Sequence, residues 1–274
     1  MDFSAITPAT ELYNVHSHTQ FCDGKATMEE FAEAAAKCGM THYGFSPHSP
    51  VPIESPCNMK REDVPAFLDE VRRLNTLYEG RTRFYAAMEV DYLDDSWGPS
   101  NPYFASLGLD YIIGSVHFIP NDSGFVDIDG RFESFRDKMS RYFANDIRHV
   151  VKTFYSQSHA MLAAGGLDIL GHFDKVGQNA SYFRPGIEDE YWYKCEVHDL
   201  IDDIIARGQR IELNTKAFAE HGRFFPGVRY IPELLSHDIE IIVNSDAHRP
   251  ALINASRPQA LAAISEYGTH KSEK

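Results

Sequence analysis

The chain has 274 residues, of which 43% are hydrophobic and 24% charged, a composition that is ordinary for a soluble globular protein. Its formal net charge of −14 and pI of about 5.3 disfavour general nucleic-acid binding, because lysine and arginine contacts with phosphate supply most of that affinity. The four cysteines show no C-x-x-C spacing, and we find neither a signal peptide nor the roughly 18-residue apolar stretch of a transmembrane helix, so we expect a cytoplasmic protein.

Short apolar segments alternate with amphipathic ones along the chain. The predicted strands are residues 12–15, 42–46, 84–88, 111–115, 167–170, 210–213 and 240–243. The predicted helices are residues 28–38, 64–78, one or two within 132–164, then 190–206, 232–236 and 257–266. This alternation predicts a parallel sheet, and it favours one β/α barrel that folds as a single domain over residues 1–274.

Paired polar residues follow the first and the last predicted strand. His16 and His18 come directly after residues 12–15, and the pair Asp246 and His248 follows residues 240–243. Residues two apart in a strand point to the same face, so each pair can address one metal ion. Isolated candidates lie at or near the ends of other apolar runs: Asp23, His48, Glu89, His117 and His172. Strand ends meet at one face of a β/α barrel, which predicts one site there.

Imidazole and carboxylate groups without thiolates suit zinc, iron or manganese better than calcium or magnesium. Nine candidates exceed the three or four protein ligands of a single catalytic zinc, so we expect two or three divalent ions that share a carboxylate. Glu89 is the candidate bridge, because it ends a predicted strand and carries two oxygens. Taken singly, His48 or His117 is more often a hydrogen-bonded structural residue, and Asp23-Gly24 is also a common turn dipeptide.

The order of these motifs resembles that of the PHP (polymerase and histidinol phosphatase) family. The motifs are His16-Ser17-His18, Asp23-Gly24, His48, Glu89, Ser115-Val116-His117, Gly171-His172 and Ser245-Asp246-Ala247-His248. The resemblance implies a distorted seven-stranded TIM-like barrel with a metal centre at the carboxyl ends of its strands, and all nine positions as ligands. The segments Gly44–Pro50 and Gly171–Lys175 are most similar to the stand-alone histidinol-phosphate phosphatases of the family.

The same resemblance implies a hydrolase that acts on a phosphate monoester, here L-histidinol phosphate in histidine biosynthesis. A metal-bridging hydroxide is the expected nucleophile, because a bound ion lowers the pKa of water from 15.7 toward roughly 7. Several cations would also neutralise the charge of the phosphate in the transition state. Asp246, with His248 beside it, is the candidate for proton transfer.

Substrate-binding groups are expected on the loops that carry the ligands. Lys216 and Asn214 follow the sixth predicted strand at the depth of the ligands, where an ammonium suits a phosphate. Lys175 is a further candidate that can equally be a solvated surface charge, and that surface role is the favoured one for the remaining basic candidates, Arg223, Arg229 and Arg249. An imidazole and an amine on the substrate would need acidic or aromatic partners, for which the candidates are Asp91, Asp174 and Phe118.

Other functions stay open at this point. One is a PHP-type nuclease or nucleotide phosphoesterase, although the net charge of −14 disfavours polynucleotides. Another is a non-catalytic PHP domain that metals stabilise, which a complete ligand set disfavours. An amidohydrolase-type barrel would need a lysine in a middle strand, and we find none at that position. The expected partner is a small phosphate monoester rather than nucleic acid or a membrane, and the oligomeric state stays undetermined.

Overall fold

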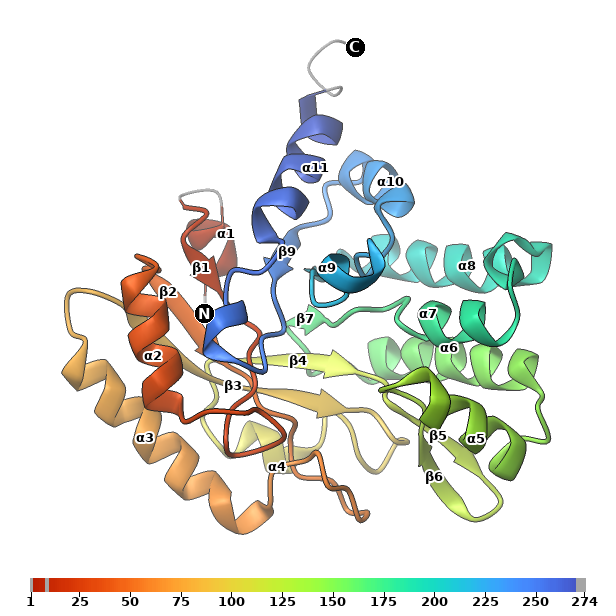
Figure 1. Cartoon of the computed structure of the whole chain (residues 1–274), viewed down its shortest axis with the longest axis horizontal. Helices are drawn as coiled ribbons and strands as arrows, with labels where there is room; N and C mark the ends of the chain where they lie inside the picture. Colours follow the sequence, from red (N-terminus) through yellow and green to blue (C-terminus); the bar gives the residue numbers. More distant parts are fainter. Residues whose placement is uncertain (1, 8–9, 270–274) are drawn as a thin grey trace.

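Seven parallel strands lie at the centre of the computed structural model, which describes residues 2–7 and 10–269 (Figure 1). Each strand pairs in parallel with its neighbours, as the alternation of strands and helices predicted. In sheet order the strands are β1 (Tyr13–Asn14), β2 (His42–Phe45), β3 (Arg83–Asp91), β4 (Tyr111–Ser115), β7 (Ile169–Leu170), β8 (Ile211–Asn214) and β9 (Ile241–Asn244).

The first and last strands meet at their carboxyl ends and nearly close the sheet into a barrel. Ser17 forms a parallel bridge with Ala247, and the His18 amide donates to the Ala247 carbonyl at 2.9 Å. Across the same seam, the Val15 amide donates to Asn244 Oδ1 at 2.9 Å, although 229 positions separate the two residues in the chain. This is the seven-stranded α/β barrel of TIM-like class that the sequence predicted. The contact between its first and last strands brings the first histidine pair, His16 and His18, next to Asp246 and His248.

The helices pack their apolar faces against the sheet and against one another. In α2 (Met28–Lys37), apolar residues three or four positions apart are buried, and a capping box between Thr27 and Glu30 begins the helix. Full burial of its Phe31 contributes roughly 1.5–3 kcal/mol. No helix among the described residues is long and apolar enough to cross a membrane. The remaining α-helices are α1 (Phe3–Ile6), α3 (Val64–Leu77), α4 (Pro102–Ala105), α5 (Phe132–Tyr142), α6 (Ile147–Ala164), α7 (Val176–Phe183), α8 (Tyr191–Arg207), α9 (Phe218–His221), α10 (Ile231–Ser236) and α11 (Arg257–Thr269), and the 3-10 turns are η1 (Arg61–Asp63), η2 (Ile187–Asp189), η3 (Val228–Tyr230) and η4 (Pro250–Leu252).

The insertion after β4 differs most from the sequence prediction. An antiparallel hairpin forms there from β5 (Phe118–Asn121) and β6 (Gly124–Asp127), which the pattern does not predict because Pro120 interrupts the strand signal. Residues 132–164 form two helices, α5 and α6, which separate where Ala144 and Asn145 have φ of 49° and 61°. Helix α7, which follows β7, was also not predicted, and its residues line a pocket together with the start of α5.

Candidate metal centre

The nine side chains that the sequence groups as metal ligands lie close together at the carboxyl end of the barrel. Six of them are buried, and the other three are partly exposed. Chain segments separated by more than two hundred positions contribute to this cluster because β1 and β9 are neighbours. The members are His16, His18, Asp23, His48, Glu89, His117, His172, Asp246 and His248.

The Glu89 carboxylate lies at the centre of the cluster. Its Oε2 is 3.0 Å from His48 Nδ1 and 3.3 Å from His16 Nε2. Its Oε1 is 2.8 Å from His172 Nε2 and 3.6 Å from His117 Nε2. Burial opposes ionisation of this carboxyl, but the surrounding imidazoles, His16 first, hold its pKa well below the usual range. Both oxygens therefore face ring nitrogens, which is the arrangement that a bridging carboxylate requires.

The strand that carries Glu89 is longer than the predicted residues 84–88. Its pairing with β4 continues through Glu89 and Ile113 to Asp91 and Ser115, so Glu89 lies within β3. The prediction that Glu89 ends its strand is therefore wrong, because the strand continues two residues further. Asp91 points to the same face as Glu89, and its Oδ1 accepts a hydrogen bond from His117 Nδ1 at 2.7 Å. The structure thus places Asp91 behind a candidate ligand, where it is 1% exposed, and not against a substrate as predicted.

A tight turn folds Asp23 back over the first histidine pair. Its Oδ1 lies 3.2 Å from His248 Nε2 and 3.9 Å from His18 Nδ1. Gly24 makes this possible, because a Cβ at that position would lie 2.3 Å from the His18 carbonyl carbon. The imidazoles of His18 and His248 stack with centroids 4.1 Å apart, so the residues after β1 and β9 form one surface.

The donor set fits divalent cations. Imidazole and carboxylate groups are the ligands that zinc, iron and manganese accept. His117 Nε2 is buried and has no hydrogen-bond partner among the described residues, a state that metal ligation would explain. Three groups offer ligand atoms within 4.8 Å of one another, and they share members: His18, Asp23, His48 and His248; His16, His18 and Glu89; His48, Glu89 and His117. The shared members imply adjacent ions rather than isolated ones.

Asp246 links the other members of the cluster to Lys216, the predicted phosphate-binding lysine. Its Oδ1 is 3.1 Å from His18 Nε2, and its Oδ2 is 3.3 Å from Lys216 Nζ. Burial opposes ionisation, but the Lys216 ammonium together with His16 and His18 outweighs it and holds the pKa of Asp246 well below its usual range. Asn214 is buried and donates to Asp246 Oδ2 at 3.1 Å, so it holds this carboxylate and does not face a substrate as predicted.

The other predicted substrate residues are dispersed. Asp174 is buried and accepts a hydrogen bond from the Gly227 amide at 2.9 Å. Arg223 and Arg229 both donate to Glu188, at 2.6 Å and 2.8 Å, so their charges are used within the protein. The predicted substrate contacts of Asp174 and Arg229 are therefore not supported by their positions. Arg249 is exposed next to His248, and its contact with phosphate stays a prediction.

Sequence reasoning missed one residue of the site, Glu212. It is fully buried in β8, and its Oε1 lies 2.6 Å from His16 Nδ1. A signal was present in the sequence, because buried parallel strands normally read as continuous apolar runs. The charged residue between Ile211 and Leu213 breaks that rule.

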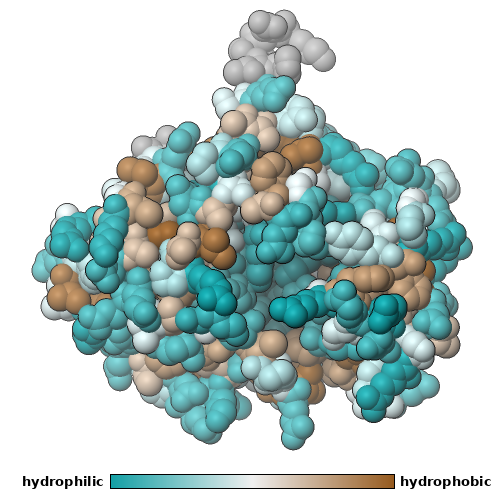
Figure 2. Space-filling view, in the orientation of Figure 1, coloured by the Kyte–Doolittle hydropathy of each residue, from teal (hydrophilic) through white to brown (hydrophobic). Residues whose placement is uncertain are grey.

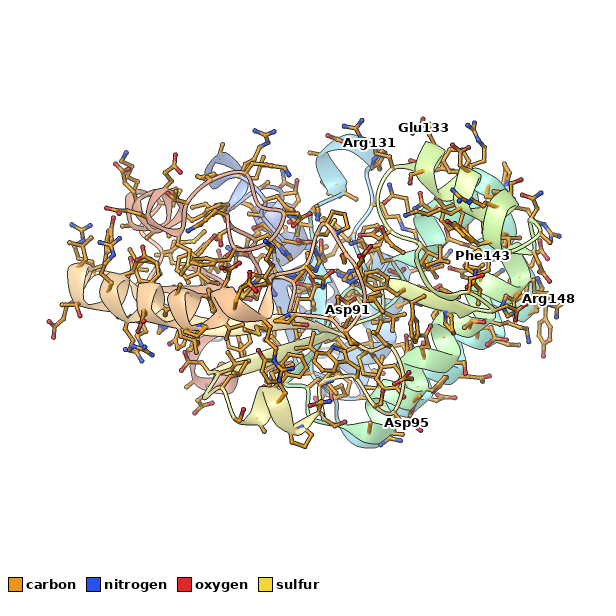
Figure 3. The ribbon with its side chains drawn as sticks, turned by 90° about the horizontal axis from the view of Figure 1, so that it is seen from below. Asp91, Asp95, Arg131, Glu133, Phe143 and Arg148 are labelled. Carbon is orange, nitrogen blue, oxygen red and sulfur yellow. The ribbon has the colours of Figure 1, made fainter. Side chains whose placement is uncertain are left out.

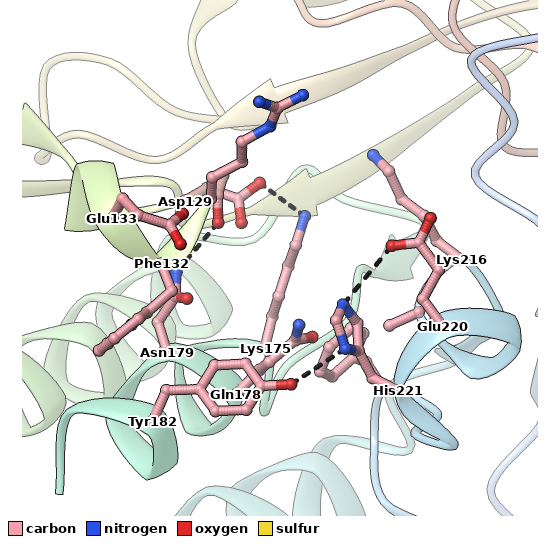
Figure 4. Close-up of a pocket in the computed structure, with 14 residues that line it drawn as sticks. Asp129, Phe132, Glu133, Lys175, Gln178, Asn179, Tyr182, Lys216, Glu220 and His221 are labelled. Carbon is pink, nitrogen blue, oxygen red and sulfur yellow. Dashed lines mark hydrogen bonds and ion pairs between the residues drawn. The ribbon is translucent and has the colours of Figure 1, made fainter. Parts of the chain in front are cut away.

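Figure 4 shows a pocket of about 630 Å³, and one of its lining residues, Lys216, contacts Asp246 and His248 of the cluster. Lys216 and Lys175 line it, and Lys175 Nζ forms an ion pair with Asp129 at 2.8 Å. Burial favours the neutral amine, but Asp129, Asp246 and Glu89 outweigh it and raise the pKa of Lys175. The two ammonium groups therefore place positive charge between the pocket and the carboxylates of the cluster.

The remaining walls of the pocket include acidic, aromatic and uncharged polar residues and one arginine, Arg131. Tyr182 Oη lies 3.0 Å from His221 Nδ1, and His221 Nε2 lies 3.7 Å from a Glu220 oxygen. Glu133 and Arg131 lie at the edge of the molecule in Figure 3, whereas Asp91 lies in its interior. The face that carries α9 is hollowed near its middle, and hydrophilic residues surround the hollow (Figure 2). The pocket thus combines cationic, acidic and aromatic groups in one space.

Comparison with known proteins identifies relatives over nearly the whole chain. The family model of the PHP domain matches residues 14–198. A protein of Deinococcus radiodurans named probable histidinol-phosphatase is 23% identical over 263 residues, which cover 94% of this chain and 95% of that protein. The histidinol-phosphatase of Bacillus subtilis is 24% identical over 255 residues, which cover 85% of this chain and 92% of that protein.

Two solved structures with the same fold also carry the name of histidinol phosphatases. A candidate histidinol phosphatase of Listeria monocytogenes has a TM-score of 0.80 at 17% identity and covers 90% of this chain and 99% of its own. The histidinol phosphate phosphatase of Lactococcus lactis, solved with zinc, L-histidinol and phosphate, has a TM-score of 0.68 at 16% identity and covers 94% of both chains. At these identities the structures establish the barrel fold of this chain.

Proposed function

This chain belongs to the PHP domain family, and from that premise we propose that it hydrolyses L-histidinol phosphate to L-histidinol and inorganic phosphate. Two relatives that align with most of its length are named for that activity. We further propose that the nine clustered side chains hold two or three divalent ions (zinc, iron or manganese). Zinc in the Lactococcus lactis structure and the grouped histidines and carboxylates of this chain support that assignment. Residues 1–274 would act as one domain.

One observation carries the proposal: five histidines surround both oxygens of Glu89, and a pocket-lining lysine, Lys216, contacts the same cluster through Asp246 and His248. A domain that metals only stabilise has no need for an open pocket beside the metal cluster, and Lys175 and Lys216 line such a pocket here. A net charge of −14 and a pocket that contains Glu133 and Glu220 disfavour a polynucleotide substrate. A small phosphate monoester fits both the charge and the size of this site.

Ions held by the cluster would supply an activated water and neutralise the phosphate charge. Lys216, which lies within 3.4 Å of Asp246 and His248, would bind a phosphate oxygen through a charge-assisted hydrogen bond. Asp246 Oδ1 lies among His18 and Lys216, where it would hold the proton of the attacking water. Asn214 keeps the carboxylate in this orientation through its bond to Oδ2.

The rest of the pocket suits the leaving alcohol. L-histidinol carries an ammonium and an imidazole, which need acidic and aromatic neighbours. Glu133 and Glu220 supply carboxylates, and Phe132 and Tyr182 supply rings whose centroids lie 5.6 Å apart. Positive lysines at the cluster and carboxylates elsewhere in the pocket therefore match a substrate with a phosphate at one end and an ammonium at the other.

A substrate panel tests this function. Protein reconstituted with zinc or manganese is assayed against histidinol phosphate, nucleoside monophosphates, single-stranded DNA and p-nitrophenyl phosphate. We expect kcat/KM for histidinol phosphate to exceed that for every other substrate by several orders of magnitude. Turnover of DNA or nucleotides alone would establish the nuclease or nucleotide phosphoesterase alternative, and no turnover by fully metallated protein would establish the non-catalytic one.

A further inference from the structure

Glu212 is a fully buried carboxylate in β8 that lies outside the nine proposed ligands. Two nitrogen atoms face each of its oxygens. Oε1 lies 2.6 Å from His16 Nδ1 and 3.1 Å from Asn244 Nδ2. Oε2 lies 3.2 Å from the His172 amide nitrogen and 3.1 Å from Asn214 Nδ2. Two of these neighbours, His16 and His172, are candidate metal ligands.

The orientation of both asparagine amides is fixed by backbone groups that can only donate. Asn244 Oδ1 accepts a hydrogen bond from the Val15 amide at 2.9 Å, and Asn214 Oδ1 accepts one from the Lys216 amide at 3.0 Å. The NH₂ group of each side chain therefore points to Glu212. With the backbone amide of His172, three of the four neighbours of Glu212 are donors whatever the tautomer of His16.

Three donors stabilise the ionised form of Glu212, and a carboxylate can only accept, so the proton of the fourth contact lies on His16 Nδ1. This leaves His16 Nε2 as a lone pair. That atom lies 3.3 Å from Glu89 Oε2 and 3.1 Å from His18 Nε2, on the side of the cluster. Glu212 thus selects the one tautomer of His16 that can ligate a cation there.

We infer that Glu212 is a positioning residue of the metal centre, an inference that rests on the proposed function because it requires the cluster to hold metal. It orients the ring of His16 through Nδ1 and anchors the loop of His172 through its backbone. Through Asn214, which also donates to Asp246 Oδ2 at 3.1 Å, it fixes a third member of the cluster. One buried charge therefore orients three candidate ligands that come from three different strands.

Glu212→Gln tests the role of the charge, because glutamine keeps the shape of the side chain and removes its charge. While His16 ligates through Nε2, the NH₂ group of the glutamine would face two donors in either orientation, so two of the four hydrogen bonds are lost. We expect Glu212→Gln to weaken zinc binding about 10- to 100-fold, as substitutions of groups behind a metal ligand do. Zinc content by elemental analysis and the rate of zinc transfer to a chromophoric chelator measure this directly, without a substrate.

Two matched variants complete the design. Glu212→Asp keeps the charge but is one methylene shorter, and we expect it to retain zinc better than the glutamine variant. Glu240→Gln makes the same chemical change at the amino end of β9, away from the cluster at the carboxyl ends of the strands. Glu240 there accepts a hydrogen bond from Arg210 Nε at 2.7 Å. This control should release zinc at the rate of the unsubstituted protein.

Zinc affinity and release that are unchanged in Glu212→Gln would overturn the inference. If that variant does not fold, the unsubstituted protein tests the inference instead. Nitrogen NMR of this protein, with labelled histidines and bound cadmium, must show His16 protonated at Nδ1 and cadmium coupling at Nε2. The opposite tautomer would also refute the role. These readouts are independent of the substrate, so failure of the histidinol phosphate assignment alone leaves them unaffected.

Discussion

His48 Nδ1 lies 3.0 Å from Glu89 Oε2, and this contact joins two parts of the metal cluster. His48 belongs to the group that contains Asp23 and to the group that contains His117, and Glu89 is also shared between two groups. Because adjacent sites share these two side chains, loss of either one affects more than one ion. The shared pair is the structural reason to expect that the ions bind together.

Replacement of His48 by alanine is expected to lower metal content and kcat together. The loss in metal affinity should be at least about 10-fold, because even residues behind a ligand contribute that much. Elemental analysis and steady-state kinetics measure both quantities. His42→Ala is the control, since His42 begins β2 and bonds Tyr85 Oη at 2.8 Å. Full metal content with full turnover in His48→Ala would remove His48 from the site.

Lys216→Met is expected to raise KM for the phosphate monoester about 10-fold or more without loss of metal. A hydrogen bond to a charged group contributes roughly 1.5–3 kcal/mol, and the methionine removes it while keeping most of the side-chain volume. Lys152→Met is the control, because Lys152 pairs with Glu196 on α8 at 2.9 Å. If neither KM nor kcat changes in Lys216→Met, this lysine does not bind the phosphate.

The acidic wall of the pocket should affect only substrates that carry an ammonium. In the double variant Glu133→Gln/Glu220→Gln, we expect KM for histidinol phosphate to rise up to about fivefold. Exposed ion pairs contribute roughly 0.2–1 kcal/mol, which sets this limit. KM for p-nitrophenyl phosphate, which has no ammonium, should not change. Equal effects on both substrates would contradict the proposed orientation of the alcohol in the pocket.

The turn at Gly24 should be intolerant of any side chain. In Gly24→Ala, the new Cβ would lie 2.3 Å from the His18 carbonyl carbon, so the turn must move and take Asp23 with it. We expect the variant to lose metal, as measured by elemental analysis. Gly80→Ala is the comparison: its φ is +74° but nothing lies within 4 Å, so it should cost about 1 kcal/mol of stability and keep its metal.

Asp174 should make folding stability depend on pH. Burial is the main reason that the pKa of its carboxyl is raised to about 6, against the opposing effect of Arg223. The unfolded pKa is about 3.9. A raised folded-state pKa means that its favourable contribution is complete below pH ~4 and is lost as the pH rises through ~6.

Asp174→Asn cannot ionise and still offers an oxygen to the Gly227 amide. Relative to the unsubstituted protein, its free energy of unfolding should therefore rise by roughly 2–3 kcal/mol between pH ~4 and pH ~7. Urea denaturation of the metal-free proteins measures this difference without a change in metal loading. A difference that is constant across this pH range would show that Asp174 ionises normally in the folded state.

The sequence by itself determined the barrel and the membership of the cluster. Apolar runs that alternate with amphipathic segments predict all seven strands of the main sheet, because burial on both faces of a parallel strand forces an apolar sequence. Polar residues at the ends of those runs, such as His16 and Asp246, are then visible as exceptions. Their convergence follows from the barrel, in which carboxyl ends of strands meet at one face.

Only the tertiary structure decided which polar groups face the cluster and which stand behind it. Asp91 and Asn214 occur at strand ends as the candidate ligands do, and Glu212 lies within β8, yet each makes a hydrogen bond to a neighbouring ligand. Spacing along one strand gives the face of the sheet but not the distance to side chains from other strands. The pocket formed by α5, α7 and α9 was likewise beyond the sequence, because it depends on how separate insertions pack together.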